Sequence, residues 1–168
     1  MSSKTHGILQ MLPQPSHYMP ARPDIVVYSQ DKRRVLVVEV KEGKEPDPEH
    51  TAGLRRTLIA HDLLPHAPFF LLAYRTRLFL WRQETKPGEP PDYSASAAPI
   101  LDDYASSFLK AGSPLRESGL QLIIFAWLAD LASGARVPHP DSEPDRMSVE
   151  SGLWGDIRLG DVQFEADT

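Results

Sequence analysis

Two runs of β-branched residues, separated by a short polar stretch, place the strongest limit on how this chain can fold. Ile25 to Tyr28 forms the first run and Arg34 to Val40 the second, with Ser29-Gln30-Asp31-Lys32 in between. β-Branched residues favour strands, and a polar link of this length favours a hairpin between them. The second run is apolar almost throughout and contains a single acid, Glu39. Such a run is typical of a central strand that is buried on both faces.

The remaining signals predict a sheet flanked by helices. The elements expected after the hairpin are a helix from 47 or 48 to about 64, strands at 69–74 and 78–81, and helices at about 100–110 and 114–133. Residues 84–99 are rich in Pro, Gly, Ser and Ala and are expected to form a surface loop. This order predicts an α/β fold with a mixed β-sheet, because a doubly wound parallel sheet would need a regular alternation of strand and helix.

The length of the chain indicates one domain over residues 1–168, and the positions of its prolines and weak structure signals indicate weakly structured ends. Residues 1–22 hold three prolines and no Asp or Glu, which is typical of an irregular arm. Structure signals weaken after residue 138, so 138–168 is expected to be a loosely packed tail. Within this tail, Leu153-Trp154 is expected to dock on the core and 162–164 to form a short strand.

Composition excludes several classes of protein. The chain has no cysteine, which excludes disulfides and cysteine-ligated metal sites. No stretch approaches the roughly 20 apolar residues of a membrane span, and the first residues lack the apolar segment of a signal peptide. A cytoplasmic protein without membrane contact is therefore the expectation. The net charge of −5 gives no global attraction to nucleic acid, so binding of a polyanion would depend on a locally basic face.

Three residues at the ends of the predicted hairpin form a candidate site. Asp24 begins the first strand and Glu39 lies near the end of the second, so antiparallel pairing brings the two carboxylates together. Glu39 and Lys41 are two positions apart and project from one face. Neighbouring carboxylates repel each other unless a cation lies between them, and oxygen ligands suit Mg²⁺, for which Mn²⁺ can substitute. The Val40 carbonyl is a further candidate ligand, and Lys41 would orient or activate a water.

Pro23-Asp24 followed by Glu39-Val40-Lys41 at the end of an apolar strand resembles the PD-(D/E)xK nuclease superfamily, which includes restriction endonucleases and repair nucleases. The resemblance covers about residues 21–82 and implies a restriction endonuclease-like fold. It also implies that Asp24 and Glu39 bind the metal, that Lys41 is the catalytic lysine, and that DNA phosphodiester bonds are hydrolysed. Many members carry another acid on a helix before the first strand, whereas nothing before Asp24 is acidic here.

Other interpretations stay open at this point. A solvated strand end with an ordinary salt bridge is the alternative for the three site residues. A catalytically inactive module of the same fold that binds DNA or a protein partner is the alternative function. Arg55 and Arg75 are candidate phosphate ligands, although exposed helix faces and turns are often charged for solubility alone. One apolar stripe is expected to pack in the core, with a homodimer interface as the alternative: Leu120, Ile123, Ile124, Trp127, Leu128 and Leu131.

Overall fold

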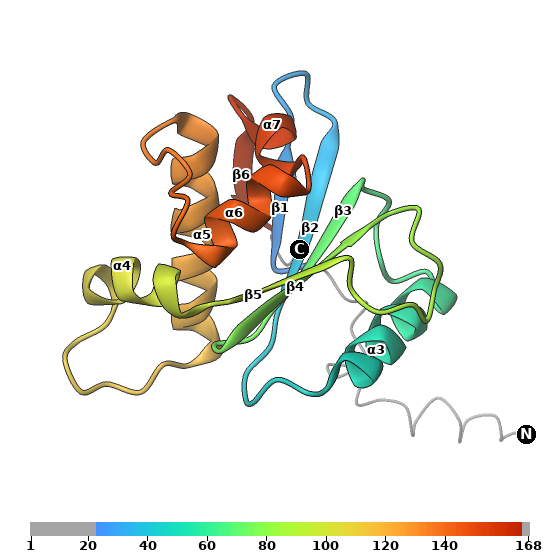
Figure 1. The fold of residues 1–168 in the computed structure, drawn as a ribbon, viewed down its shortest axis with the longest axis horizontal. Coiled ribbons are helices and arrows are strands. Elements are labelled where there is room, and N and C mark those ends of the chain that lie inside the picture. The colour runs from blue at the N-terminus through green and yellow to red at the C-terminus, as the bar shows by residue number, and fades with distance from the viewer. Residues whose placement is uncertain (1–22, 166–168) are drawn as a thin grey trace, which may run out of the picture.

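A single mixed sheet forms the centre of the molecule, as the computed structural model shows for residues 23–165 (Figure 1). The arm expected at 1–22 lies outside these described residues. Within them, the sheet has six strands in the order β5-β4-β3-β2-β1-β6. The strands are β1 (Ile25–Tyr28), β2 (Arg34–Val40), β3 (Phe69–Ala73), β4 (Arg77–Arg82), β5 (Tyr93–Ser96) and β6 (Asp161–Phe164).

The predicted hairpin is confirmed. β1 and β2 pair antiparallel, with Ile25 opposite Val38, and the Ser29 N–H donates to the Arg33 carbonyl at 2.7 Å across the turn. β2 and β3 run parallel, with Leu36 opposite Phe69, while β3 and β4 are antiparallel. The sheet is therefore mixed, as the order of elements predicted. A parallel pair needs a long crossover, and here the crossover contains the helix α3 (Pro48–Ala60).

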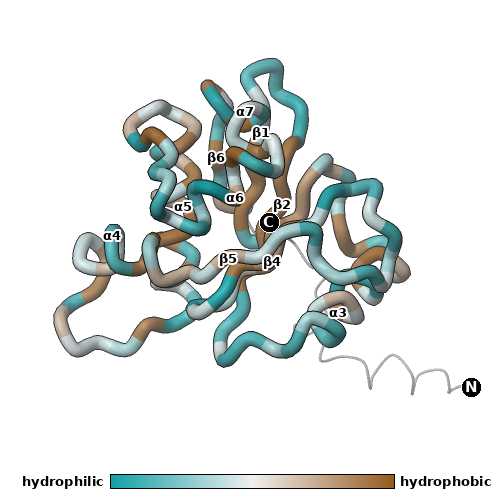
Figure 2. The backbone as a smooth tube through the Cα atoms, viewed as in Figure 1, coloured by the Kyte–Doolittle hydropathy of each residue, from teal (hydrophilic) through white to brown (hydrophobic). Residues whose placement is uncertain are grey.

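Helices cover both faces of the sheet. Leu54 and Leu58 of α3 pack against a smaller apolar cluster on one face. The opposite face carries the larger core and the helices α4 (Ala98–Phe108), α5 (Glu117–Ser133), α6 (Glu143–Glu150) and α7 (Leu153–Ile157). Figure 2 shows that hydrophobic residues concentrate in the strands and the hydrophilic ones in the connecting loops. Within residues 23–165, none of the helices has the length and apolar run that crossing a bilayer requires.

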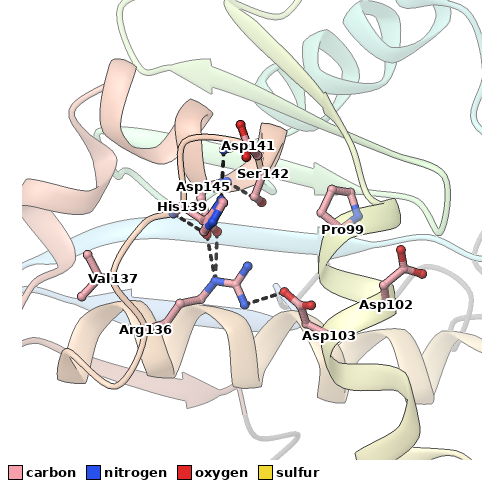
Figure 3. Close-up of a pocket in the computed structure, with 9 residues that line it drawn as sticks. All are labelled: Pro99, Asp102, Asp103, Arg136, Val137, His139, Asp141, Ser142 and Asp145. Carbon is pink, nitrogen blue, oxygen red and sulfur yellow. Dashed lines mark hydrogen bonds and ion pairs between the residues drawn. The ribbon is translucent and has the colours of Figure 1, made fainter.

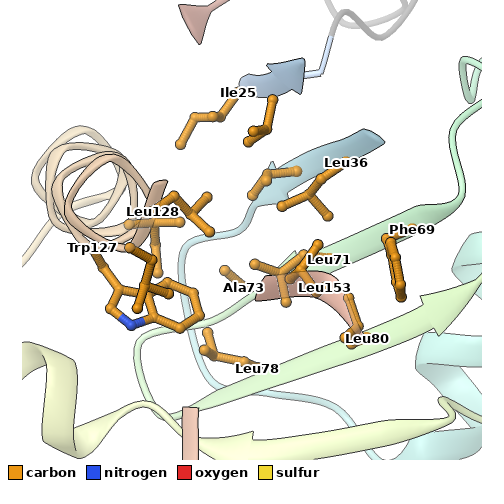
Figure 4. Packing of buried hydrophobic residues seen from close by; sticks show 14 of the residues in the cluster. Ile25, Leu36, Phe69, Leu71, Ala73, Leu78, Leu80, Trp127, Leu128 and Leu153 are labelled. Atoms are coloured by element: carbon orange, nitrogen blue, oxygen red, sulfur yellow. The ribbon is translucent and has the colours of Figure 1, made fainter. Parts of the chain in front are cut away.

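The long helix α5 supplies much of the larger core (Figure 4). Trp127 and Leu128 lie over Leu71 and Leu78 of the central strands, and all four side chains are fully buried. The predicted core stripe is confirmed, because each of its members is at most 2% exposed: Leu120, Ile123, Ile124, Trp127, Leu128 and Leu131. The sheet therefore covers the face that was the alternative homodimer interface.

Two expectations are wrong. Residues 93–96, inside the expected loop, form the edge strand β5, whose Ala95 is fully buried. Small residues such as Ser and Ala carry little strand signal, so only pairing with β4 reveals this strand. The segment from residue 138 is packed rather than loose as far as Ile157, and the largely exposed strand β6 follows it. Leu153 is fully buried in α7, as its expected docking requires, and β6 pairs with β1.

Helix boundaries differ from the expected ones for local reasons. α3 ends at Ala60 instead of near residue 64, and Asp62 then adopts a left-handed φ of 56°. α5 begins at Glu117, three residues later than expected, and ends at Gly134 as predicted. Gly134 has a φ of 90°, which is the left-handed conformation that glycine favours after a helix.

Candidate functional site

The carboxylate of Asp24 lies against the end of β2. The Asp24 N–H donates to the Val38 carbonyl at 2.9 Å, so the backbone of Asp24 stays bonded to β2 just before β1 begins, near Glu39. Asp24 Oδ2 accepts a hydrogen bond from the Val40 N–H at 2.7 Å. The Asp24 side chain thus bonds to the backbone of β2 at a position where β1, which begins at Ile25, offers no strand partner.

Glu39 is an acid inside the sheet, with only 9% of its surface exposed. Val37 faces the cluster beneath α3, so alternation along β2 turns Glu39 to the same side. Burial, and then the negative charge of Asp24, raise the pKa of Glu39 to about 7. The positive charge of Lys41 opposes this rise. Asp24 and Lys41, which the sequence predicted to lie beside Glu39, are therefore close enough to influence the pKa of Glu39.

Two residues at the start of α5 join this group, and neither was predicted from the sequence to belong to a site. Gln121 Nε2 donates to Asp24 Oδ1 at 3.1 Å. Glu117 lies one helical turn earlier on the same face of α5. Burial, and then the charge of Asp24, raise the pKa of Glu117, and the charge of Glu117 in turn adds to the raised pKa of Glu39. We call Asp24, Glu39, Lys41, Glu117 and Gln121 the carboxylate cluster.

The third acid of the cluster comes from a helix that follows β5 in sequence. The family resemblance instead implies such an acid before Asp24, where none exists. A signal was present downstream, because Glu117 and Gln121 are polar residues four positions apart at the start of a strongly apolar helix. Glu117 also stands in the first turn of α5, where the helix dipole favours a negative charge.

A small hollow of about 120 Å³ adjoins the cluster and is lined by Lys41, Glu117, Arg75 and Arg116. Arg75 lies in the turn between β3 and β4, and its side chain is exposed. The Lys41 N–H donates to the Ala73 carbonyl at 2.9 Å, which holds the backbone of Lys41 beside the end of β3. Three cationic side chains thus line one hollow next to the buried acids.

Arg55, the other predicted phosphate ligand, lies elsewhere. Its side chain is 3% exposed, and its guanidinium donates to the Arg82 carbonyl at 3.2 Å and to the Lys86 carbonyl at 3.4 Å. The guanidinium also lies 5.7 Å from the centroid of the Trp81 ring. The structure gives Arg55 a packing role between α3 and β4, so we do not retain it as a phosphate ligand.

The donor set of the cluster fits a hard divalent cation in its chemistry. Three carboxylates are present, and the N–H and carbonyl of Val40 point to the same side of β2, so this carbonyl also faces Asp24. Among residues 23–165, however, no three His, Cys, Asp or Glu side chains already stand in a metal-holding arrangement. Both Asp24 oxygens accept hydrogen bonds from the protein. Binding of a cation would require Glu39 and Glu117 to turn toward Asp24.

A second charged group, around a hollow of about 440 Å³, is centred on the ion pairs of Arg136 (Figure 3). The fully buried Asp145 accepts hydrogen bonds from Arg136 Nε at 2.9 Å, Trp127 Nε1 at 2.8 Å and the His139 N–H at 3.0 Å. Arg136 also pairs with Asp103 at 3.0 Å. These bonds link Arg136, in the segment after α5, to Asp145 of α6 and Asp103 of α4. We therefore assign them a structural role.

No family model matches the sequence, and neither a curated protein nor a solved structure does. The cluster and its hollow combine four acids, one of which is the Glu42 that lines the hollow, with one ammonium group and two guanidinium groups at one end of a sheet. This combination suits an anionic substrate held beside a divalent cation.

Proposed function

We propose that this protein is a metal-dependent nuclease of the PD-(D/E)xK type that hydrolyses DNA phosphodiester bonds. One observation carries the proposal: Glu39 is an acid buried near the end of a central strand, close to Asp24 and two positions before Lys41. A buried acid lowers stability, and such groups concentrate at functional sites. The order of hairpin, crossover helix and second strand pair also supports a restriction endonuclease-like core.

Each residue of the cluster has a role in this proposal. Asp24 and Glu39 would hold Mg²⁺ or Mn²⁺, with Glu117 and the Val40 carbonyl as further oxygen ligands. The ion, when bound, supplies positive charge to the phosphate and makes water more acidic. Lys41 offers an ammonium group that can orient a water and stabilise the charge that develops on the phosphate. Gln121 is a positioning residue, because its hydrogen bond fixes the Asp24 carboxylate.

Arg75 and Arg116 give the substrate a place to bind. Both line the hollow that Lys41 and Glu117 share, and both are exposed. Contacts of this kind with backbone phosphates supply most of the sequence-independent affinity for nucleic acid. The net charge of −5 does not oppose this assignment, since the local field at the hollow is what a phosphate meets.

Cleavage assays with matched variants test the proposal. Wild-type protein is incubated with supercoiled plasmid, linear duplex, single-stranded DNA or RNA in the presence of Mg²⁺, Mn²⁺ or EDTA. We expect metal-dependent cleavage of DNA, and a loss of about 10²-fold or more in Lys41→Ala and Asp24→Asn. Lys44→Ala is the matched control, because it removes the same charge from an exposed position nearby and should leave activity unchanged. Equal activity of wild type and Lys41→Ala would refute the catalytic role.

A second candidate function has one observation in its favour. Both oxygens of Asp24 already accept hydrogen bonds from Val40 and Gln121, as they would in an inactive module that binds DNA without a metal. Such a module would bind DNA in a salt-sensitive way that survives Asp24→Ala, and it would cleave nothing with any metal. Titration with Mn²⁺, followed by electron paramagnetic resonance, separates the two functions: the nuclease binds the ion and the inactive module does not.

A further inference from the structure

A third hollow, of about 270 Å³, lies far from the carboxylate cluster. It is lined by residues of α3, of the segment that leads into β3, and of the loop after β4. Phe69, at the start of β3, borders this hollow, whereas the cluster lies level with the other end of the same strand, beside Ala73. The two sites are therefore separated by the length of β3.

Most of the lining is apolar. Ile59 and Leu64 come from α3 and the segment after it, Phe69 and Phe70 from β3, and Pro87 from the loop after β4. Phe70 also stacks on Trp81, with ring centroids 5.6 Å apart, so this wall is held in place by the cluster beneath α3. Apolar walls of this kind remove the hydrophobic part of a small molecule from water.

The lining also includes one buried cation, Arg55. Its side chain is 3% exposed, and Nε is buried without a hydrogen-bond partner among the described residues. None of the ion pairs found within residues 23–165 includes Arg55. Burial lowers the pKa of Arg55, while the charge of Asp92 acts weakly in the other direction. Two carbonyls thus accept hydrogen bonds from the guanidinium, but Nε has no partner, and within residues 23–165 no acid pairs with Arg55, although the exposed Asp62 lines the same hollow.

A buried charge without a counter-ion costs free energy, and an anion in the adjoining hollow would reduce that cost. The rim offers further polar groups, because Gln83 and His66 lie within 3.4 Å of each other there and Thr85 is close by. The volume is below the range of about 300–1,000 Å³ that is common for drug-sized ligands.

We propose that this hollow binds a small monoanion with an apolar body, of the aryl or alkyl carboxylate class. The carboxylate lies toward Arg55 and compensates its charge, and the ring or chain packs against Ile59 and Phe70. This inference does not rest on the nuclease proposal, because none of the residues that carry it belongs to the carboxylate cluster.

Isothermal titration and amide chemical-shift mapping with benzoate, benzamide and inorganic phosphate test the inference on the full chain. We expect benzoate to bind in the millimolar range and to shift resonances of Ile59 and Phe70. Benzamide has the same shape without the charge, and phosphate has charge without an apolar body, so both should bind at least tenfold more weakly. Equal binding of benzoate and either control overturns the proposal, as does the absence of benzoate binding.

Two variants separate charge from shape. Arg55→Gln removes the cation and should weaken benzoate binding at least tenfold. Ala67→Leu fills part of the hollow while Arg55 stays intact, and it should weaken benzoate binding by a similar factor. If Arg55→Gln fails to fold, Ala67→Leu still tests the site. Unchanged benzoate affinity in Ala67→Leu would place the ligand elsewhere and contradict the proposal.

Discussion

Gln121 and Asp24 are 97 positions apart in the sequence, and yet the Gln121 side chain donates a hydrogen bond to Asp24 Oδ1 at 3.1 Å. This bond joins the long helix α5 to the hairpin and fixes one oxygen of the carboxylate. The Val40 N–H fixes the other at 2.7 Å. The orientation of Asp24 therefore depends on a strand and a helix that only the folded chain brings together.

Replacement of Gln121 by Ala removes one of these restraints. A hydrogen bond to a charged acceptor contributes about 1.5–3 kcal/mol, and partial exposure of this pair places the expected loss of unfolding free energy near 1 kcal/mol. Urea denaturation measures the loss. Gln163→Ala is the control, since Gln163 lies on the exposed strand β6 and bonds only to the neighbouring Asp161. An equal effect of the two variants would contradict a special role for Gln121.

The raised pKa of Glu39 predicts how stability depends on pH. In the folded protein this pKa is about 7, against a usual value of 4.5, so the folded state binds the proton more tightly. The stabilising contribution of the protonated carboxyl is complete below pH 4.5 and is lost as the pH rises through about 7. The shift corresponds to about 3 kcal/mol.

Glu39→Gln keeps the shape of the side chain and removes this titration. We expect the metal-free variant to be more stable than wild type at pH 8, by up to about 3 kcal/mol, and to resemble it at pH 4.5. Urea denaturation at several pH values in EDTA measures the difference. Glu49→Gln, at an exposed position on α3, should leave the pH profile unchanged. Parallel profiles of wild type and Glu39→Gln would show that Glu39 titrates normally.

Mn²⁺ should stabilise the wild type, but not Glu39→Gln, at high pH if the cluster binds the ion. Ligation by a carboxylate requires its charged form, so binding stabilises the wild type most above pH 7. A ligand at 100 times its Kd adds about 2.7 kcal/mol to the unfolding free energy. We expect Mn²⁺ to raise the Tm of the wild type at pH 8 and to leave Glu39→Gln unchanged. A rise of equal size in both would place the ion outside the cluster.

The sequence predicted those parts of the structure that depend on local patterns. The alternation of β2 and the short turn after β1 determine the hairpin and its register, and with them the approach of Asp24 to Glu39. The apolar stripe of α5 likewise identified its buried face before any neighbour was known. Both inferences use spacing within a single element or between adjacent ones.

What the sequence did not predict depends on contacts between distant segments. Glu117 joins the site because α5 docks with its first turn beside Asp24, and no local pattern specifies where a helix docks. Arg55 became buried because the carbonyls of Arg82 and Lys86 surround its guanidinium. Apart from Tyr93, the strand β5 is composed of small residues, and it acquires its structure from pairing with β4. Each miss is a case in which tertiary contacts outweigh local preference.

Asp145 should be among the residues on which the stability of the fold depends most. Its carboxylate is fully buried and accepts hydrogen bonds from Arg136, Trp127 and the His139 backbone. Asp145→Asn keeps the size of the side chain but leaves Arg136 without its buried partner and turns an amide N–H toward other donors. Loss of one partner from a buried ion pair costs about 3–5 kcal/mol. Asp103, the other partner of Arg136, has a side chain that is 52% exposed. Asp103→Asn should therefore cost less than about 1 kcal/mol. Urea denaturation of both variants at pH 7 measures this contrast, and equal losses would mean that burial does not set the strength of the Asp145 contacts.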